Sequence, residues 1–197
     1  MRPNIFGKGA TFVSTDLLES AITSTRGVLG AVDVSQMNDP TPCAQWNVSQ
    51  LINHIVGGQF YFLGILAGEI RDEEPTNFSA GDFLKAFDRG SRLCVDAFGY
   101  EGVMSEILTL PSTEITGYSF VRVAATDIFV HGWDLARAIS LSTDLSADLA
   151  AKLLVAAKLA IPPIVRSASG APFAPEQTVP TGVSEADQLA AYLGRRV

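Results

Sequence analysis

The sequence has little basic charge, no long apolar run, and few cysteines and histidines. Its 14 Lys and Arg residues stand against 21 Asp and Glu residues, so the formal net charge is −7. This acidic balance argues against a nucleic acid or an anionic membrane surface as a partner. Every apolar run is interrupted well short of the roughly 18 residues that a membrane-spanning helix needs. Residues 1–13 lack the apolar core and cleavage site of a signal peptide. We therefore predict a protein with no nucleic-acid and no membrane partner.

Cysteine usage and overall composition bound the compartment and the fold class. The two cysteines, Cys43 and Cys94, lie far apart and form no CxxC motif, which is typical of free thiols in a reducing cytosol. Hydrophobic residues make up 47% of the chain and charged residues 18%, as in a folded globular protein. A length of 197 residues suits one domain with a substantial core. We therefore expect residues 1–197 to form a single cytoplasmic domain.

The apolar residues recur mostly at helical spacing, which predicts an all-α fold. Ser14, Thr15 and Asp16 can cap a first helix, and Asn47 with Gln50 forms a capping box at the start of a second. Further helices are expected from Ser79, over residues 118–139 and 146–161, and from Ser184 onward, with a short extended turn within residues 104–116. The pattern indicates an up-down four-helix bundle with additional C-terminal helices.

Polar residues interrupt two of the apolar helix faces. Asp127 and His131 are about one helical turn apart and project from the same face. His54, the other histidine of the chain, lies on the inward stripe of the second predicted helix. Two imidazoles and a carboxylate that meet inside a bundle suit a divalent metal, and three protein ligands leave a position for water or a substrate thiol. The alternative is that Asp127 and His131 bond to each other and that His54 is an ordinary core histidine.

Three segments of the chain resemble a known family. They are TPCAQWNVSQLINHIVGG (41–58), ATDIFVHGWDLARA (125–138) and ADQLAAYLGRR (186–196). They are similar to the DinB-like metal-binding proteins, and more closely to the family sharing the N-terminal domain of mycothiol-dependent maleylpyruvate isomerase, in its stand-alone, single-domain branch. The resemblance implies a four-helix bundle that holds a metal, usually zinc, through His54, Asp127 and His131. In two respects the chain departs from the isomerase: Asp127 replaces a glutamate, and the chain is too short for a second domain.

The resemblance and the site chemistry lead to one favoured function and two alternatives. The favoured one is a divalent-metal-dependent thiol transferase or isomerase that uses a small-molecule thiol such as mycothiol with an electrophile, because a cation stabilises a thiolate at neutral pH. We expect zinc, with nickel or iron(II) as alternatives for the same ligands. The other two functions are a non-catalytic metal-binding sensor or stress-associated protein, and a structural bundle without metal. A homodimer is compatible with each of these functions.

Residues beside the predicted ligands have a structural and a functional interpretation. Asp134 could orient His131, but an Asp134–Arg137 surface pair is the favoured role, with Trp133 packed against a neighbouring helix. Cys43 could approach the metal from the loop before the second helix, although a buried, inert thiol is favoured.

Two further features are interpreted as structural. Arg122 could meet an anionic substrate, but a solvated surface position is favoured for this side chain. Gly57 and Gly58 are expected to permit close helix packing, or a local bulge, near His54.

Overall fold

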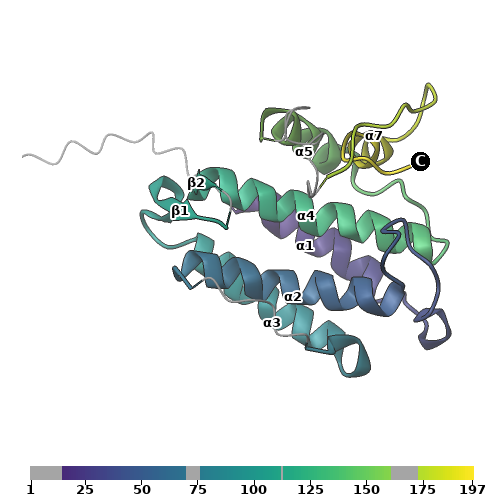
Figure 1. The fold of residues 1–197 in the computed structure, drawn as a ribbon, viewed down its shortest axis with the longest axis horizontal. Helices are drawn as coiled ribbons and strands as arrows, with labels where there is room; N and C mark the ends of the chain where they lie inside the picture. The colour runs from purple at the N-terminus through teal and green to yellow at the C-terminus, as the bar shows by residue number, and fades with distance from the viewer. Residues whose placement is uncertain (1–14, 70–75, 112, 161–172) are drawn as a thin grey trace, which may run out of the picture.

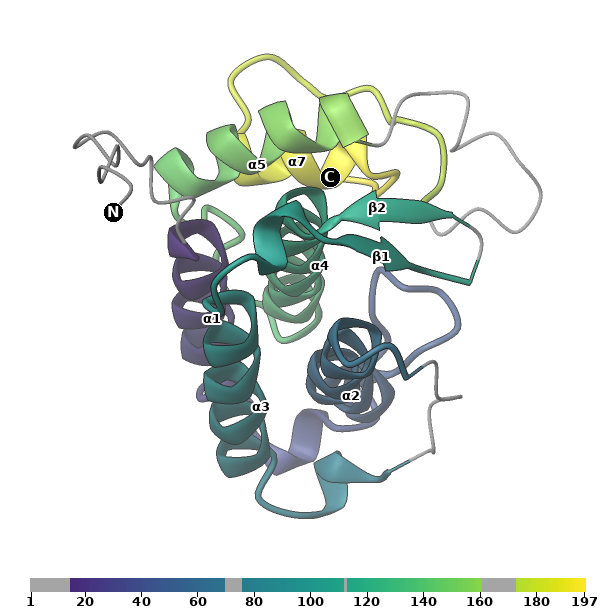
Figure 2. The ribbon, with the colours of Figure 1, turned by 90° about the vertical axis from the view of Figure 1, so that its left-hand side faces the viewer.

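The computed structural model describes residues 15–69, 76–111, 113–160 and 173–197, and these residues are mostly helical. Helices α1 to α4 pack side by side as a bundle, and α5 and α7 pack on α4 (Figure 1 and Figure 2). The helices are α1 (Asp16–Leu29), α2 (Val48–Leu66), α3 (Phe83–Phe98), α4 (Gly117–Ala138), α5 (Ala147–Ala160) and α7 (Glu185–Tyr192), with short 3₁₀-helices η1 (Val34–Gln36), η2 (Phe78–Ala80) and η3 (Val103–Ser105). The all-α, DinB-like fold with C-terminal helices is therefore confirmed.

Capping side chains begin α2 and α7 at the predicted places, whereas the side chain of Thr15 makes no capping bond at the start of α1. Asn47 Oδ1 accepts a hydrogen bond from the Gln50 N–H at 2.9 Å, and Gln50 Oε1 accepts one from the Asn47 N–H at 3.0 Å. This reciprocal pair satisfies two backbone donors that α2 could not satisfy itself. Ser184 caps α7 in the predicted position by accepting a bond from the Asp187 N–H at 3.1 Å.

The third helix begins later than predicted. Residues 78–80 form η2, and α3 begins at Phe83 with Asp82 as its cap. Side chains of α2 hold this segment: Asn53 Oδ1 accepts a hydrogen bond from the Ser79 N–H at 2.8 Å, and the Ser49 and Ser79 hydroxyl oxygens are 2.6 Å apart. These bonds use Ser79 to attach the segment to α2, so Ser79 does not cap a helix.

The order of helix directions differs from simple alternation. The hydrogen bonds of Ser79 place the chain before α3 at the beginning of α2, and Gln59 further along α2 bonds Ser91 further along α3. Helices α2 and α3 therefore run in the same direction, while α1 and α4 run the opposite way (Figure 1). The four-helix bundle is as predicted, but its second and third helices run parallel, so the helix directions do not simply alternate along the chain.

Strands β1 (Ile107–Thr109) and β2 (Glu114–Thr116) form a two-stranded antiparallel sheet that leads into α4. This hairpin is the extended turn predicted within residues 104–116. Thr116, the last residue of β2, is also the cap of α4, because its hydroxyl oxygen accepts a bond from the Ser119 N–H at 3.2 Å. The hairpin thereby fixes where α4 begins, and α4 supplies two of the three predicted metal ligands.

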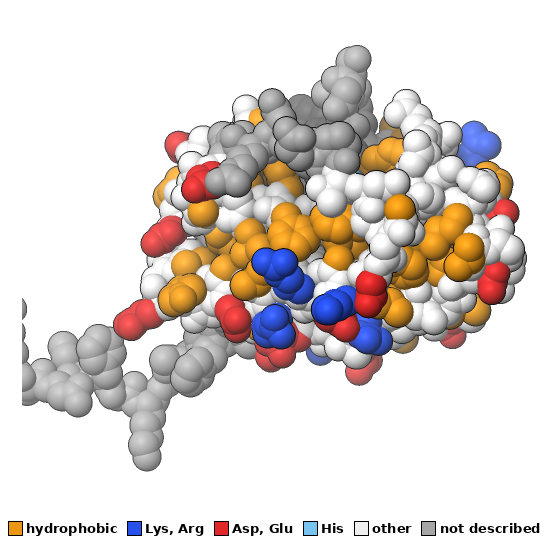
Figure 3. Space-filling model, turned by 90° about the horizontal axis from the view of Figure 1, so that it is seen from below, with side chains coloured by type: hydrophobic (Ala, Val, Ile, Leu, Met, Phe, Trp, Pro, Cys, Tyr) orange, Lys and Arg blue, Asp and Glu red, His pale blue; other side chains and the backbone are white. Residues whose placement is uncertain are grey.

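The core lies between the four bundle helices and continues under α5 and α7. Its largest fully buried side chains include Trp133, Phe87, Phe98, Phe120 and Phe129. Outside the core, Lys and Arg side chains lie beside Asp and Glu on the face seen in Figure 3, next to a band of apolar side chains. In the described ranges no helix is long and apolar enough to cross a membrane.

Candidate metal centre

The structure brings the three predicted ligands together. His54 lies on α2, Asp127 and His131 lie on α4, and one donor atom from each residue falls within 4.8 Å of the other two. His131 Nε2 is 3.6 Å from Asp127 Oδ1, and the two imidazole rings meet edge to face with centroids 4.6 Å apart. Helices α2 and α4 pack against each other, which explains why residues 73 positions apart converge. That these residues bind a metal remains a prediction.

The ligand group is partly open to solvent. The Asp127 side chain is 25% exposed and the His131 side chain 10% exposed. Trp46 covers one side, with its ring centroid 4.4 Å from that of His54 and 5.9 Å from that of His131. The loop carrying Trp46 is held by a hydrogen bond from the Thr41 hydroxyl to the Trp46 carbonyl oxygen at 2.8 Å. The candidate site therefore has an aromatic side chain on one face and a carboxylate that reaches solvent.

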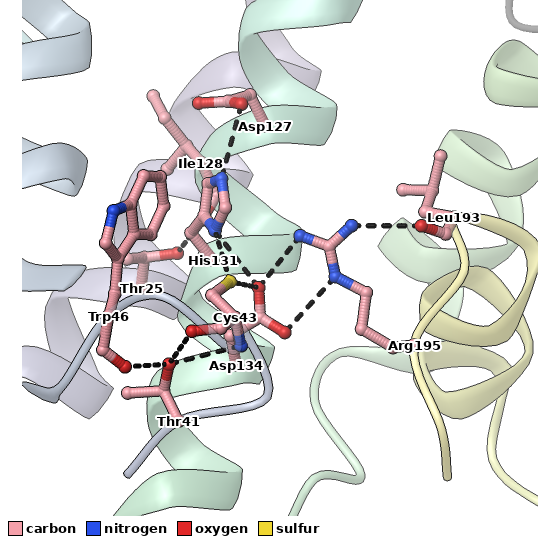
Figure 4. A network of polar contacts seen from close by, with 10 residues as sticks. All are labelled: Thr25, Thr41, Cys43, Trp46, Asp127, Ile128, His131, Asp134, Leu193 and Arg195. Carbon is pink, nitrogen blue, oxygen red and sulfur yellow. Dashed lines mark hydrogen bonds and ion pairs between the residues drawn. The ribbon is translucent and has the colours of Figure 1, made fainter. Parts of the chain in front are cut away.

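The other nitrogen of His131 faces a second polar group (Figure 4). His131 Nδ1 is 3.0 Å from Asp134 Oδ2, and the thiol of Cys43 donates to the same oxygen at 3.3 Å. Arg195, from the C-terminal tail, donates to both oxygens of Asp134, through Nε at 3.2 Å and Nη2 at 3.0 Å. Such a two-pronged contact is the strong form of an Arg–carboxylate pair.

The predicted surface pair between Asp134 and Arg137 is wrong. Asp134 is fully buried, while Arg137 is exposed and its guanidinium lies 5.8 Å from the Trp133 ring centroid. Asp134 lies three residues after His131 and therefore shares its face of α4. A carboxylate that is fully buried on this face needs a cationic partner. The partner itself, Arg195, is 61 residues away and only the tertiary structure identifies it.

Trp133 packs against a neighbouring helix as predicted. It is fully buried, and its Nε1–H donates to Asp187 Oδ1 on α7 at 2.8 Å. Cys43 departs from the favoured interpretation of a buried, inert thiol, because it is only half-buried and its sulfur reaches the site. Its sulfur lies 3.9 Å from His131 Nδ1, on the side away from Asp127.

Among the residues that the structure describes, two groups of donor atoms are thus close enough to hold a metal, and His131 belongs to both. One group is His54, Asp127 and His131, and the other is Cys43, His131 and Asp134. In the second group the guanidinium of Arg195 already contacts both carboxylate oxygens. A cation there would have to displace a buried positive charge. The first group has no such competitor, since within the described ranges no Lys or Arg forms an ion pair with Asp127.

The electrostatic surroundings differ between the two histidines. Burial lowers the pKa of His54, and the charge of Asp127 offsets this effect only in part. Burial also opposes a charge on His131, but Asp127, Asp134 and Cys43 together raise its pKa to about 10. Burial would raise the pKa of Asp134, yet His131 and Arg195 hold it below its ordinary value. His54 thus offers a lone pair at neutral pH, whereas at His131 a proton and a metal would compete for Nε2.

The glycines near His54 are not needed for close packing. A methyl group built on Gly57 would come no closer than 3.8 Å to Phe78, and one on Gly58 no closer than 3.9 Å to Asp127 Oδ2. Helix α2 also runs without interruption through both positions, so the predicted bulge is absent from it. Beside His131, a tight approach lies at Gly132, where such a methyl group would be 2.4 Å from the Thr25 hydroxyl oxygen. This contact joins α4 to α1 directly after His131.

Arg122 is neither fully solvated nor near the donor atoms. It is half-buried and its guanidinium carbon lies 4.0 Å from the centroid of the Tyr118 ring, one helical turn earlier on α4. A cation–π contact of this kind holds the side chain along the helix. The structure therefore gives Arg122 a role in packing on α4.

A helical bundle that gathers two imidazoles and a carboxylate between α2 and α4 has the architecture of a DinB-like domain. The family model of the mycothiol maleylpyruvate isomerase N-terminal domain matches residues 18–136, so the chain belongs to this family. The matched range includes both histidines, Asp127 and Asp134, and it ends before α5, α7 and Arg195.

Two uncharacterized proteins of Mycobacterium tuberculosis are also similar, one from strain CDC 1551 / Oshkosh and one from strain H37Rv. Each is 38% identical over 170 residues, which cover 86% of this chain and 91% of the relative. Because 170 aligned residues cannot fit within the first 136 positions of the chain, these matches must extend past residue 136 into the C-terminal part. No solved structure matches the chain.

Proposed function

We propose that this protein binds one divalent metal ion, zinc first, through His54, Asp127 and His131. The observation that carries the proposal is the donor set itself: two imidazoles and a carboxylate within 4.8 Å of one another, with the carboxylate unpaired by any described Lys or Arg. Neutral nitrogen and anionic oxygen donors are the ligands that zinc accepts, and nickel or iron(II) accept them as well.

The shorter arm of Asp127 is compatible with this role. Asp127 belongs to the same face of α4 as His131, and its Oδ1 already lies 3.6 Å from Nε2. Gly58 on α2 faces the other carboxylate oxygen, so no side chain separates α2 from Asp127 at this level. Because Asp127 lies one helical turn before His131, its carboxylate could reach a cation bound to the histidine with little movement of the backbone.

For the reaction, we propose thiol transfer or isomerisation with a small-molecule thiol of the mycothiol type and an electrophile. A bound divalent cation would favour the thiolate form of such a thiol and act as a Lewis acid. The chain's own residues would orient the reactants: Trp46 forms a flat wall beside both imidazoles, and Asp134 fixes the orientation of His131 through Nδ1. Family membership supports a thiol of this type as the co-substrate.

The first test is metal analysis of the protein purified without a histidine tag, followed by calorimetric titration with zinc. We expect one metal per chain for the wild type, none for His54→Ala, and one for Cys43→Ser. The serine variant is the matched control because Cys43 belongs only to the second donor group. Retention of metal in His54→Ala together with its loss in Cys43→Ser would place the metal at the second donor group and contradict the proposal.

The second test separates catalysis from binding alone. Conjugation of mycothiol to an activated aryl halide is measured with the metal-loaded wild type and with His54→Ala. A rate that depends on His54 supports a thiol transferase, and equal rates reject it. Stoichiometric metal without turnover would favour the alternative, a non-catalytic metal-binding or sensor protein.

A further inference from the structure

The C-terminal tail reaches the candidate metal centre through one side chain. Arg195 follows α7, and its side chain is only 12% exposed. Its Nε and Nη2 hold both oxygens of Asp134, and its Nη1 donates to the Leu193 carbonyl oxygen at 3.0 Å. All three nitrogens of the guanidinium are therefore fixed, which leaves the group a single orientation (Figure 4).

The carboxylate that Arg195 holds is the one that contacts His131. Asp134 Oδ2 lies 3.0 Å from His131 Nδ1 and 3.0 Å from Arg195 Nη2, so one oxygen joins the two side chains. A histidine whose Nδ1–H is bonded to a carboxylate has a fixed ring, and its Nε2 points away from that carboxylate. Without Arg195, Asp134 would be a fully buried carboxylate whose side-chain partners among the described residues are His131 and Cys43.

The tail is also anchored to α4 at a second point. Trp133, the residue before Asp134, donates its Nε1–H to Asp187 on α7. This anchor holds α7 on α4 without contact to His131 or Asp134, so the two contacts can be broken separately. The matches to the mycobacterial relatives extend past residue 136, whereas the family model ends there.

From this geometry we infer that Arg195 is a positioning residue of the metal centre, which acts through Asp134 to fix the His131 ring so that Nε2 faces Asp127 and His54. The inference rests on the proposed function for the identity of the ligands. It assigns the C-terminal tail, which lies outside the four-helix bundle, a part in completing the site. A tail that only covered the bundle would need apolar side chains and not a guanidinium with every nitrogen bonded.

The test has one measurement that needs no metal and one that does. The first is the proton on His131 Nδ1, observed by nuclear magnetic resonance in the metal-free protein. Because the chain has two histidines, His54→Ala leaves His131 as the single source of imidazole signals. The second is the affinity for Co²⁺, measured by titration together with the visible absorption spectrum of the bound ion.

In the His54→Ala background we expect a solvent-protected Nδ1 proton, and we expect Arg195→Gln to abolish this protection. In the otherwise wild-type chain, Arg195→Gln should weaken Co²⁺ binding about tenfold, the lower end of what loss of an outer hydrogen-bond partner costs. Arg195→Lys retains the charge but contacts one oxygen at a time, so it should recover part of both signals. The matched controls are Arg196→Gln, which removes a charge from an exposed neighbour, and Asp187→Ala, which breaks only the anchor of α7.

The outcomes separate the inference from the proposed function. An unchanged Nδ1 proton in Arg195→Gln overturns the inference whatever the metal does. Affinity that stays the same or rises in Arg195→Gln also overturns it, because a purely electrostatic guanidinium would repel the cation. Failure of the wild type to bind any metal overturns the proposed function, and with it the metal-positioning role. If Arg195→Gln does not fold, Arg195→Lys decides: wild-type values for both measurements would reject the inference.

Discussion

Each ring nitrogen of His131 faces an aspartate, but the two aspartates differ in exposure and in their partners. Nε2 faces Asp127, a carboxylate that is 25% exposed and has no described Lys or Arg as partner. Nδ1 faces Asp134, a carboxylate that is fully buried and held by a guanidinium. Both acids lie about one turn from His131 on α4, so helical spacing does not distinguish them. The absence of a fixed counter-ion among the described residues is why we propose Asp127, and not Asp134, as the ligand of a mobile cation.

The largest expected effect is on the free energy of unfolding, when Asp134 is replaced by asparagine; the same replacement of Asp127 is the comparison. Asp134→Asn leaves the buried Arg195 without its charge partner, and loss of one member of a buried pair costs about 3 kcal/mol. Asp127→Asn should change the free energy of unfolding by no more than about 1 kcal/mol, since the side chain is in contact with solvent. Urea unfolding in the presence of a chelator measures both variants.

Metal affinity should show the opposite order. Asp127→Asn should weaken zinc binding more than the roughly 10- to 100-fold expected when a histidine loses its outer partner in Asp134→Asn. A larger loss of metal affinity in Asp134→Asn than in Asp127→Asn would contradict the proposed site, because the metal would then lie on the Nδ1 side of His131.

The second effect is on pH dependence. The pKa of His131 is raised to about 10, so its protonated form stabilises the metal-free fold. This stability is fully present below the unfolded pKa of about 6.5 and is lost as pH rises towards 10. We therefore expect the free energy of unfolding of the metal-free protein to fall over this window, and zinc binding at pH 7.5 to release about one proton. His131→Gln is the control and should lack the fall in this window.

The third effect concerns the wall on the Nε2 side. Trp46 contacts His54, and burial is the main cause of the lowered pKa of His54. Replacing the ring in Trp46→Ala should therefore raise the pKa of His54 towards its ordinary value, which a histidine titration by nuclear magnetic resonance can follow. An unchanged pKa would mean that other groups bury His54.

The smallest effect is on the thiols. Burial raises the pKa of Cys94 to about 12, so almost no thiolate forms at pH 8, and its sulfur donates to the Gln59 carbonyl oxygen at 3.2 Å. Cys43 is half-buried at the site. We expect a thiol reagent to modify at most one cysteine in the folded protein and both after unfolding. Cys43→Ser should leave the folded protein unreactive, and reaction at Cys94 in that variant would contradict the burial argument.

Local sequence determined the helices and their beginnings. Capping at Asn47 and Ser184, and the apolar spacing of α2 and α4, depend on residues within a few positions of one another. The same local spacing placed Asp127 and His131 on one face, since one turn of a helix fixes their separation. Where a competing bond came from elsewhere, as for Ser79 with Asn53 on α2, the predicted helix start failed.

The tertiary structure alone decided which groups meet. The approach of α2 to α4 brings His54 to Asp127 and His131, and the return of the tail brings Arg195 to Asp134. The spacing of residues along the chain does not predict these contacts, because they arise from the packing of whole helices. The sequence therefore determined which side chains can bind a cation, and the fold decided which of the two acids beside His131 is left for it.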